Sequence, residues 1–248
     1  MRSDDKPTRQ QSTARPPQSG TPFVLAMAAI SCVVVGLASL PLYFMKLLTI
    51  PSSSMHPSLL LGDTAIVSKL AYSTTTPQQG DVAVVTIHRD DPPSTTFRVA
   101  RVIGLPGDTI QMQGGTLVIN GRPVPKIKAH DYVGPNYSGI VEEATCYLET
   151  LPNGVTYGVL DTEATGYLDD TKLVDVLPGH YFVLGDNRDN SADSRLPREL
   201  FGIGLVAEEE LLGRIDRLFF ALYAGANGRD RFGASIREPG CQPADAAP

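Results

Sequence analysis

The chain has no tryptophan, and its three cysteines and four histidines are scattered singly along 248 residues. They do not have the spacing of metal ligands, and there is no glycine-rich phosphate loop of the G-x-x-x-x-G-K type, so we expect neither a metal nor another cofactor. Runs of lysine and arginine are also absent, and the formal net charge is −6. These absences exclude zinc and P-loop proteins and argue against a nucleic-acid partner.

What is present indicates a folded, β-rich protein with many turns. Hydrophobic residues make up 42% and charged residues 19% of the chain, which is close to the composition of globular proteins. The 23 glycines and 20 prolines exceed the usual share and favour turns over long helices. Strands do not alternate with helical patterns, so a parallel sheet is not expected.

The N-terminal region differs from the rest of the chain. Residues 1–22 are rich in Ser, Thr, Gln and Pro and indicate a disordered tail of net charge +2. Residues 23–45 are apolar for 23 residues, which is enough for a helix to cross a bilayer and too long for a secretory signal peptide. Residues 47–248 carry 16 basic and 25 acidic side chains. The positive-inside rule therefore predicts a single-pass anchor, a cytoplasmic N-terminus and an exported domain over residues 46–248.

The exported part contains short runs of β-branched and aromatic residues between turn residues. The predicted strands are Thr64–Val67, Asp81–Ile87, Phe97–Ile103, Thr109–Met112, Thr116–Ile119, His180–Leu184 and Leu211–Tyr223. Dipeptides such as Asn120-Gly121 supply the positive φ of tight hairpin turns. Residues 126–178 contain weaker strand patterns, and we expect them to form an inserted β subdomain.

The segment Ile50–Leu59 follows the predicted anchor and holds a cluster of serines between two prolines. A serine hydroxyl becomes a nucleophile when a neighbouring base takes its proton, and further donors stabilise the oxyanion that develops. A serine cluster supplies both an attacking group and a donor. The alternative interpretation is a flexible linker between the membrane and the domain.

Two further segments have a functional and a structural interpretation. Ala100–Asp108 is a strand that ends in Pro-Gly-Asp, the pattern of an ordinary type II turn. Gly185–Arg195 is polar or charged at nine of its eleven positions. It is either a solvated loop or a buried polar network that orients a site.

In this order, the apolar span and three motifs resemble the bacterial type I signal peptidases. The motifs are PSSSMHPSLLLGD (Pro51–Asp63), RVIGLPGD (Arg101–Asp108) and GDNRDNSADSR (Gly185–Arg195). The likeness covers the chain from about Ile50 to Gly213. It implies a mainly β, antiparallel peptidase domain behind one transmembrane helix, on the outer face of the bacterial cytoplasmic membrane. It also implies a serine endopeptidase that cuts exported preproteins after small residues, with signal peptides and the lipid bilayer as partners.

The resemblance also implies roles for individual residues. Ser54 matches the nucleophile, Ser52 the hydroxyl that helps to bind the oxyanion, and Ser191 the serine that orients the general base. The implied supporting ion-pair network is Arg101, Asp186, Arg188, Asp193 and Arg195. By their closeness to Ser54 and to position 100, the expected lining residues of a groove for an extended peptide are Ile50, Met55, Leu59 and Val99.

One position departs from the family pattern. The general base of the family is a lysine immediately before the arginine of the R-V-I-G-L-P-G-D motif, and here that position is Ala100. Alanine accepts no proton, and the neighbouring Arg98 and Arg101 stay protonated. The conceivable substitutes are Lys69, Lys126, Lys128, His56 and His130, and their spacing selects none of them.

Three interpretations of Ala100 stay open at this point. The chain is a peptidase with a relocated or very weak base, a catalytically silent homologue that binds signal peptides or partners, or an ordinary peptidase with an engineered or erroneous residue at position 100. The cysteines also leave alternatives. Cys32 lies within the apolar span, whereas Cys146 and Cys241 lie in the exported part, where they form either a disulfide or two free thiols.

Overall fold

The computed structural model describes residues 25–32, 44–90, 93–135, 141–163, 165–220, 233, 235–236 and 240–241. The chain divides into two units, Met1–Tyr43 and Phe44–Pro248. In the first unit, residues 25–32 form a helix with exposed side chains. The predicted tail, and residues 23–24 and 33–43 of the predicted span, lie outside the described residues. None of the helices in the described ranges is long and apolar enough to cross a membrane.

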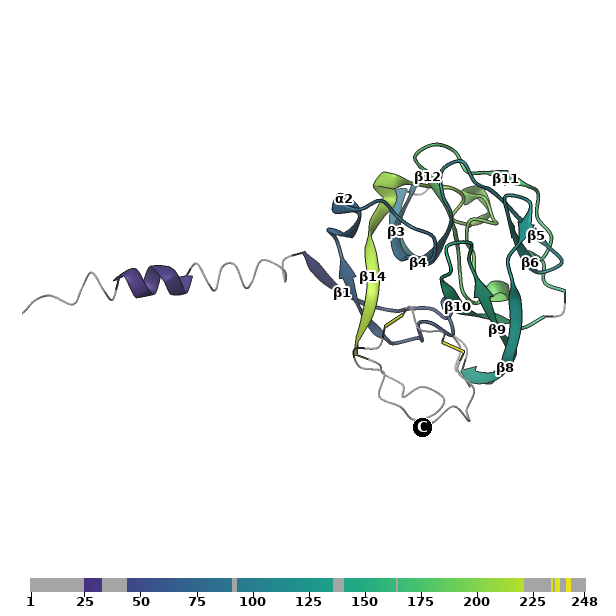
Figure 1. Ribbon diagram of the computed structural model, residues 1–248, viewed down its shortest axis with the longest axis horizontal. Coiled ribbons are helices and arrows are strands. Elements are labelled where there is room, and N and C mark those ends of the chain that lie inside the picture. The colour runs from purple at the N-terminus through teal and green to yellow at the C-terminus, as the bar shows by residue number, and fades with distance from the viewer. Residues whose placement is uncertain are drawn as a thin grey trace, which may run out of the picture. The chain divides into compact units, whose positions relative to one another are not determined.

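The second unit is mainly β, as the sequence predicted, and its largest sheet has seven antiparallel strands (Figure 1). In spatial order they are β1 (Met45–Thr49), β2 (Thr64–Ser68), β14 (Leu211–Phe220), β3 (Val82–Asp90), β4 (Pro93–Gly104), β12 (His180–Leu184) and β13 (Val206–Ala207). β3 pairs with β4 from Arg101 back to Pro93. β12 pairs with the opposite edge of β4 only from Arg101 to Gly104. The preceding residues of β4 therefore have a strand neighbour on one side among the described elements.

Two smaller antiparallel sheets complete the second unit. One contains β10 (Thr156–Asp161), β9 (Val141–Thr150) and β8 (Lys126–Pro135), and the other contains β11 (Val174–Asp175), β5 (Thr109–Gln113), β6 (Thr116–Ile119) and β7 (Arg122–Pro123). The helical elements of this unit are one short α-helix, α2 (Ala71–Thr74), and the 3-10 turns Arg188–Asn190, Arg198–Leu200 and Glu208–Glu210. Within residues 126–178, β8 to β10 form a sheet of their own, whereas β11 joins β5.

The strands follow from side-chain alternation and from the turns between them. β14 alternates between buried and less buried residues along most of its length, as expected for a strand with one face on the core. Central β3 is buried on both faces from Val82 to Val85 because other strands and the core cover it. Asn120 and Gly121 have φ values of 53° and 73°, which is the conformation that a tight turn between β6 and β7 requires.

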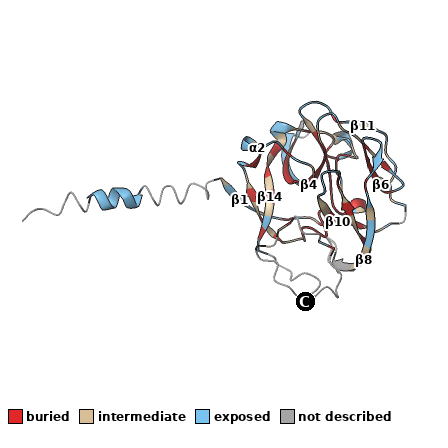
Figure 2. Ribbon diagram, in the orientation of Figure 1, coloured by how far each residue is buried: buried red, intermediate tan, exposed pale blue. Residues whose placement is uncertain are grey.

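Two apolar clusters lie on either side of the large sheet and hold the chemistry-bearing segments. Ile50, Met55 and Leu59 pack in one cluster with Val82 and Val84 of β3. Ala100 packs in the other cluster, which includes Ala83, Val102, Val183 and Ile203. Figure 2 shows these buried stretches within the strands, while much of the outer surface is exposed. The serine segment is thus anchored at three buried positions and is not a free linker.

Cys146 and Cys241 form a disulfide, which decides between the two alternatives that the sequence left open. The bond joins β9 to the C-terminal segment of the chain. Gly240 lies against the main chain of Pro57, because a Cβ atom at Gly240 would come within 2.7 Å of the Pro57 carbonyl. Gly240, next to the disulfide cysteine, therefore packs against the loop that carries the serines.

Candidate active site

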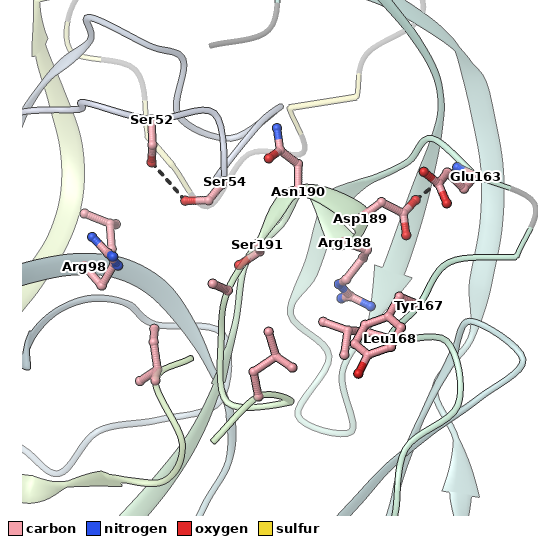
Figure 3. Close-up of a pocket in the computed structure, with 14 residues that line it drawn as sticks. Ser52, Ser54, Arg98, Glu163, Tyr167, Leu168, Arg188, Asp189, Asn190 and Ser191 are labelled. Atoms are coloured by element: carbon pink, nitrogen blue, oxygen red, sulfur yellow. Dashed lines mark hydrogen bonds between the residues drawn. The ribbon is translucent and has the colours of Figure 1, made fainter. Parts of the chain in front are cut away.

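Two serines of the cluster, Ser52 and Ser54, line a pocket. The hydroxyl oxygens of Ser52 and Ser54 are 3.1 Å apart, within hydrogen-bond distance (Figure 3). The main-chain N–H of Asn187 donates to the carbonyl of Ser54 at 3.0 Å. The side-chain amide of Asn190 donates to the Ser53 hydroxyl at 2.9 Å. The third motif, Gly185–Arg195, is therefore hydrogen-bonded directly to the serine loop.

The pocket has a volume of about 560 Å³. Its lining residues are Ser52, Ser54, Arg98, Val99, Glu163, Tyr167, Leu168, Arg188, Asp189, Asn190, Ser191, Ala192, Leu196 and Ile203. Figure 3 shows Ser191 on the side of Ser54, with Glu163, Tyr167 and Leu168 on the opposite side. The pocket therefore brings together the three serines that the resemblance assigned to catalysis.

Gly185 lies between Ser191 and the Ser54 main chain. A Cβ atom at this position would come within 2.2 Å of the Ser191 hydroxyl oxygen and 2.7 Å of the Ser54 carbonyl oxygen. Real Cβ atoms do not approach other atoms so closely, so only glycine fits here. The close approach of β12's end to the serine loop thus depends on the missing side chain.

Behind the pocket, Arg101 and Asp186 form a fully buried ion pair. Arg101 donates from Nε and Nη2 to the two carboxylate oxygens of Asp186, at 2.8 and 2.6 Å. Ser58 bridges the pair, donating to Asp186 at 2.5 Å and lying 3.1 Å from Arg101 Nη2. Burial by itself would lower the pKa of Arg101, but the charge of Asp186 and the hydrogen bonds to it raise that pKa above its usual value. The guanidinium therefore stays charged and ties the serine loop to β4.

A second buried ion pair joins the third motif to β9. Arg188 donates to both carboxylate oxygens of Glu149, at 2.8 and 2.5 Å. Tyr157 also donates to Glu149, at 2.8 Å, and its ring lies 4.3 Å from the guanidinium of Arg101. Burial and the nearby charge of Glu149 raise the pKa of the Tyr157 hydroxyl well above its usual value, so it remains a donor. The two ion pairs thus form one connected network.

A third ion pair lies within the third motif. Arg195 donates from Nε and Nη2 to the two carboxylate oxygens of Asp193, at 2.8 and 2.9 Å. Asp193 also accepts the main-chain N–H of Gly185 at 3.0 Å. All five residues of the implied network are thus paired, but Ser58, Glu149 and Tyr157 belong to it as well. Sequence reasoning missed these three, because one serine, one glutamate and one tyrosine on separate segments form no local pattern.

Ala100 lies on β4 with its side chain in the apolar cluster, and its exposed fraction is 1%. It does not line the pocket itself, although Ile203 lines the pocket and packs in the same cluster. Residues two apart in a strand share a face, so Ala100 points to the same side as Arg98, which does line the pocket. Position 100 therefore lies in the apolar cluster next to the pocket, in which Ile203 is the shared residue.

The described lining of the pocket contains no lysine and no histidine. The five conceivable substitute bases, Lys69, Lys126, Lys128, His56 and His130, lie elsewhere. His56 is buried, and its Nε2 accepts the main-chain N–H of Leu61 at 3.2 Å. Lys126 pairs with Asp161 at 2.8 Å. His56 and Lys126 thus have structural contacts, and none of the five residues lines the pocket that contains Ser54.

Among the expected groove residues, only Val99 lines this pocket. Ile50, Met55 and Leu59 are 2%, 1% and 0% exposed and pack in the core cluster beneath the serine loop. These three residues are close to Ser54 in sequence, but they are apolar and pack in the core, so they do not reach the pocket. The lining comes instead from β4 and from the segments around Glu163 and Leu196.

Comparison with known proteins agrees with this arrangement. The family model described as signal peptidase, peptidase S26, matches residues 22–220. A signal peptidase I from Leptolyngbya laminosa is 29% identical over 218 residues, which cover 85% of this chain and 88% of that protein. The signal peptidase I of Bacillus amyloliquefaciens is 30% identical over 223 residues, covering 90% of this chain and 97% of the relative.

A solved structure of a signal peptidase I from Enterococcus faecalis is also similar, with 24% identity and a TM-score of 0.30, covering 56% of this chain and 97% of the other. The family model extends over most of the chain and includes all three motifs that form the pocket and its buried ion pairs. This chain belongs to the signal peptidase family of serine peptidases.

Proposed function

We propose that the chain is a membrane-bound serine endopeptidase of the signal peptidase I type that cuts exported preproteins after small residues of their signal peptides. The observation that carries this proposal is the shared pocket of Ser52, Ser54 and Ser191, held by three buried ion pairs. Ser54 is the nucleophile. Ser52, whose hydroxyl lies 3.1 Å from that of Ser54, donates to the oxyanion together with the Ser54 main-chain N–H.

The open edge of β4 supports an extended peptide as the substrate. β12 does not cover the residues before Arg101, no other described strand pairs with them on that side, and this edge borders the pocket through Arg98 and Val99. A peptide that adds as a strand forms hydrogen bonds with the main-chain N–H and C=O groups at this edge of β4. Its alternate side chains then face the pocket beside Ser54, which is the position that we propose for the small residues.

The chemistry as proposed lacks an efficient proton acceptor. Removing one member of a catalytic unit costs several powers of ten in rate, and position 100 carries a methyl group. We therefore expect slow turnover. The same observation favours a second candidate function, a silent homologue that binds signal peptides or partners without cutting them.

The test is cleavage of a preprotein by the purified full chain in detergent or liposomes. The expected result is slow release of the mature protein that Ser54→Ala abolishes. Binding of signal peptide without any cleavage would favour the silent homologue. Rapid cleavage that survives Ser54→Ala would contradict the proposed nucleophile.

The proposed location is the bacterial cytoplasmic membrane, with the N-terminus in the cytoplasm and the peptidase domain on the outer face. It rests on the apolar residues 23–45 and on the charge difference between the flanks. Protease added to spheroplasts should digest the domain and spare the N-terminal tail. A protected domain together with a clipped tail would reverse the orientation.

A further inference from the structure

Arg98 stands out among the charged residues that line the pocket. The other lining arginine, Arg188, is buried and neutralised by Glu149. The Arg98 side chain is exposed, and its guanidinium makes no hydrogen bond or ion pair with any residue in the described ranges. An unpaired guanidinium in a site that receives a ligand is an anchoring point for an anion, because its fork of donors matches the two oxygens of a carboxylate.

The pocket carries opposite charges at its two ends. Figure 3 shows Arg98 on the side of Ser52 and Ser54, and Asp189 and Glu163 on the far side. Asp189 is occupied within the fold, since it accepts the main-chain N–H groups of Thr162 and Glu163 at 2.8 and 3.0 Å. Asp189 is therefore held away from Arg98, and Figure 3 shows Glu163 across the pocket from it, which leaves the guanidinium for a group supplied from outside.

The position of Arg98 on β4 determines which side chain of a bound peptide lies next to its guanidinium. Arg98 pairs with Val85 of β3 on one side, and its other side is the edge that β12 does not cover. In a strand added at this edge, the side chain directly opposite Arg98 on the same face lies about 5 Å away. An acidic side chain there forms a cross-strand ion pair, whereas a basic one is repelled.

We propose that Arg98 is a specificity-determining residue that selects peptides with a carboxylate at the position opposite it on the edge of β4. This inference rests on the proposed function, since it assumes that an extended peptide binds in the pocket. The favoured source of the carboxylate is an aspartate or glutamate side chain. The free C-terminus of a peptide offers the same chemistry and is distinguished by the experiment.

The experiment measures binding of labelled peptides of small residues to the full chain in detergent. A single glutamate is moved along a neutral, amidated peptide, and a further peptide ends in a free carboxylate. Glutamate at one register should tighten binding about fivefold, in the range of an exposed ion pair, and a shift by one residue should remove the gain because the side chain changes face. The gain should shrink at high salt.

Variants separate Arg98 from general charge effects. Arg98→Gln should abolish the gain, and Arg98→Glu should reverse it in favour of lysine at the same register. Arg122→Gln is the matched control, because Arg122 is also exposed but lies on β7 in another sheet. A gain that survives Arg98→Gln, or equal binding of all peptides, would overturn the proposal.

The outcomes also separate this inference from the proposed function. An Arg98-dependent gain from the free C-terminus alone would support the carboxylate site and assign its source to the peptide end. An Arg98-dependent gain without cleavage of any preprotein would leave the carboxylate site standing and refute the peptidase. Failure of every peptide to bind would overturn both.

Discussion

At the residue scale, the site depends on side chains that are absent as much as on those that are present. Gly185 allows the end of β12 to contact both Ser191 and the main chain of Ser54. We expect Gly185→Ala to force these two segments apart and to abolish signal-peptide cleavage or binding. Gly179→Ala is the control, since a Cβ atom there meets nothing within 4 Å, although its positive φ adds some strain. Equal losses in both variants would contradict the role of Gly185.

Glu149 is a second residue on which the site depends, because its buried carboxylate pairs with Arg188 of the pocket lining. Its removal leaves the guanidinium of Arg188 buried without a charged partner, so Glu149→Gln should lower the free energy of unfolding by about 3–5 kcal/mol. Asp131→Asn breaks the exposed pair with Lys128 and should cost less than about 1 kcal/mol. Denaturant unfolding in detergent measures both. A loss at Glu149 no larger than that at Asp131 would show that the buried network contributes little.

At the scale of elements, the disulfide joins β9 to Cys241, whose neighbour Gly240 packs on Pro57. The two cysteines are 95 residues apart in sequence, so the bond closes a long loop in the unfolded chain. Cys241→Ser should therefore lower the free energy of unfolding by about 2–5 kcal/mol. Cys32→Ser is the control, because Cys32 is an exposed, free thiol. The parent should lose the same stability in reductant, and an unchanged unfolding transition under reduction would contradict the prediction.

The elements were well predicted from sequence because their signals are local. The β-branched runs and the turn dipeptides define β2 to β6, β12 and β14 within a few residues. Side-chain alternation also divides each strand into two faces. It does not say by itself which of the two faces the core. Closeness in sequence to Ser54 placed Met55 in the expected groove, whereas the structure buries it beneath the loop.

At the same scale, contacts between distant segments had no sequence signal. The Glu149–Arg188 pair joins residues 39 positions apart, and the Ser58–Asp186 hydrogen bond joins residues 128 apart. Such pairs depend on how the sheets pack against each other. Single residues on separate strands form no sequence pattern from which that packing could be predicted. The third motif suggested a buried polar network, but its partners on β9, on β10 and in the serine loop appeared only in the structure.

At the scale of the whole molecule, the second unit belongs to the signal peptidase family, and its pocket brings together the proposed nucleophile Ser54, the proposed oxyanion donor Ser52 and Ser191 above three buried ion pairs. The position proposed for the general base carries the methyl group of Ala100. Ala100 lies among Ala83, Val102 and Val183, and this apolar setting would hold down the pKa of an amine introduced there. Ile203 packs in the same cluster as Ala100 and also lines the pocket that holds Ser54 and Ser191, so we expect a lysine at position 100 to extend toward these serines. The central claim is that the site is complete except for this one group.

Preprotein cleavage by Ala100→Lys tests that claim most directly. The rate should rise by about 10²–10⁴-fold over the parent, and it should increase with pH until the lysine amine is neutral. Adding Ser54→Ala should abolish the gain, and Ala192→Lys, which places an amine at the exposed pocket wall, should not reproduce it. A lysine variant that cuts no faster than the parent would contradict the account, as would fast, Ser54-dependent cleavage by the parent itself.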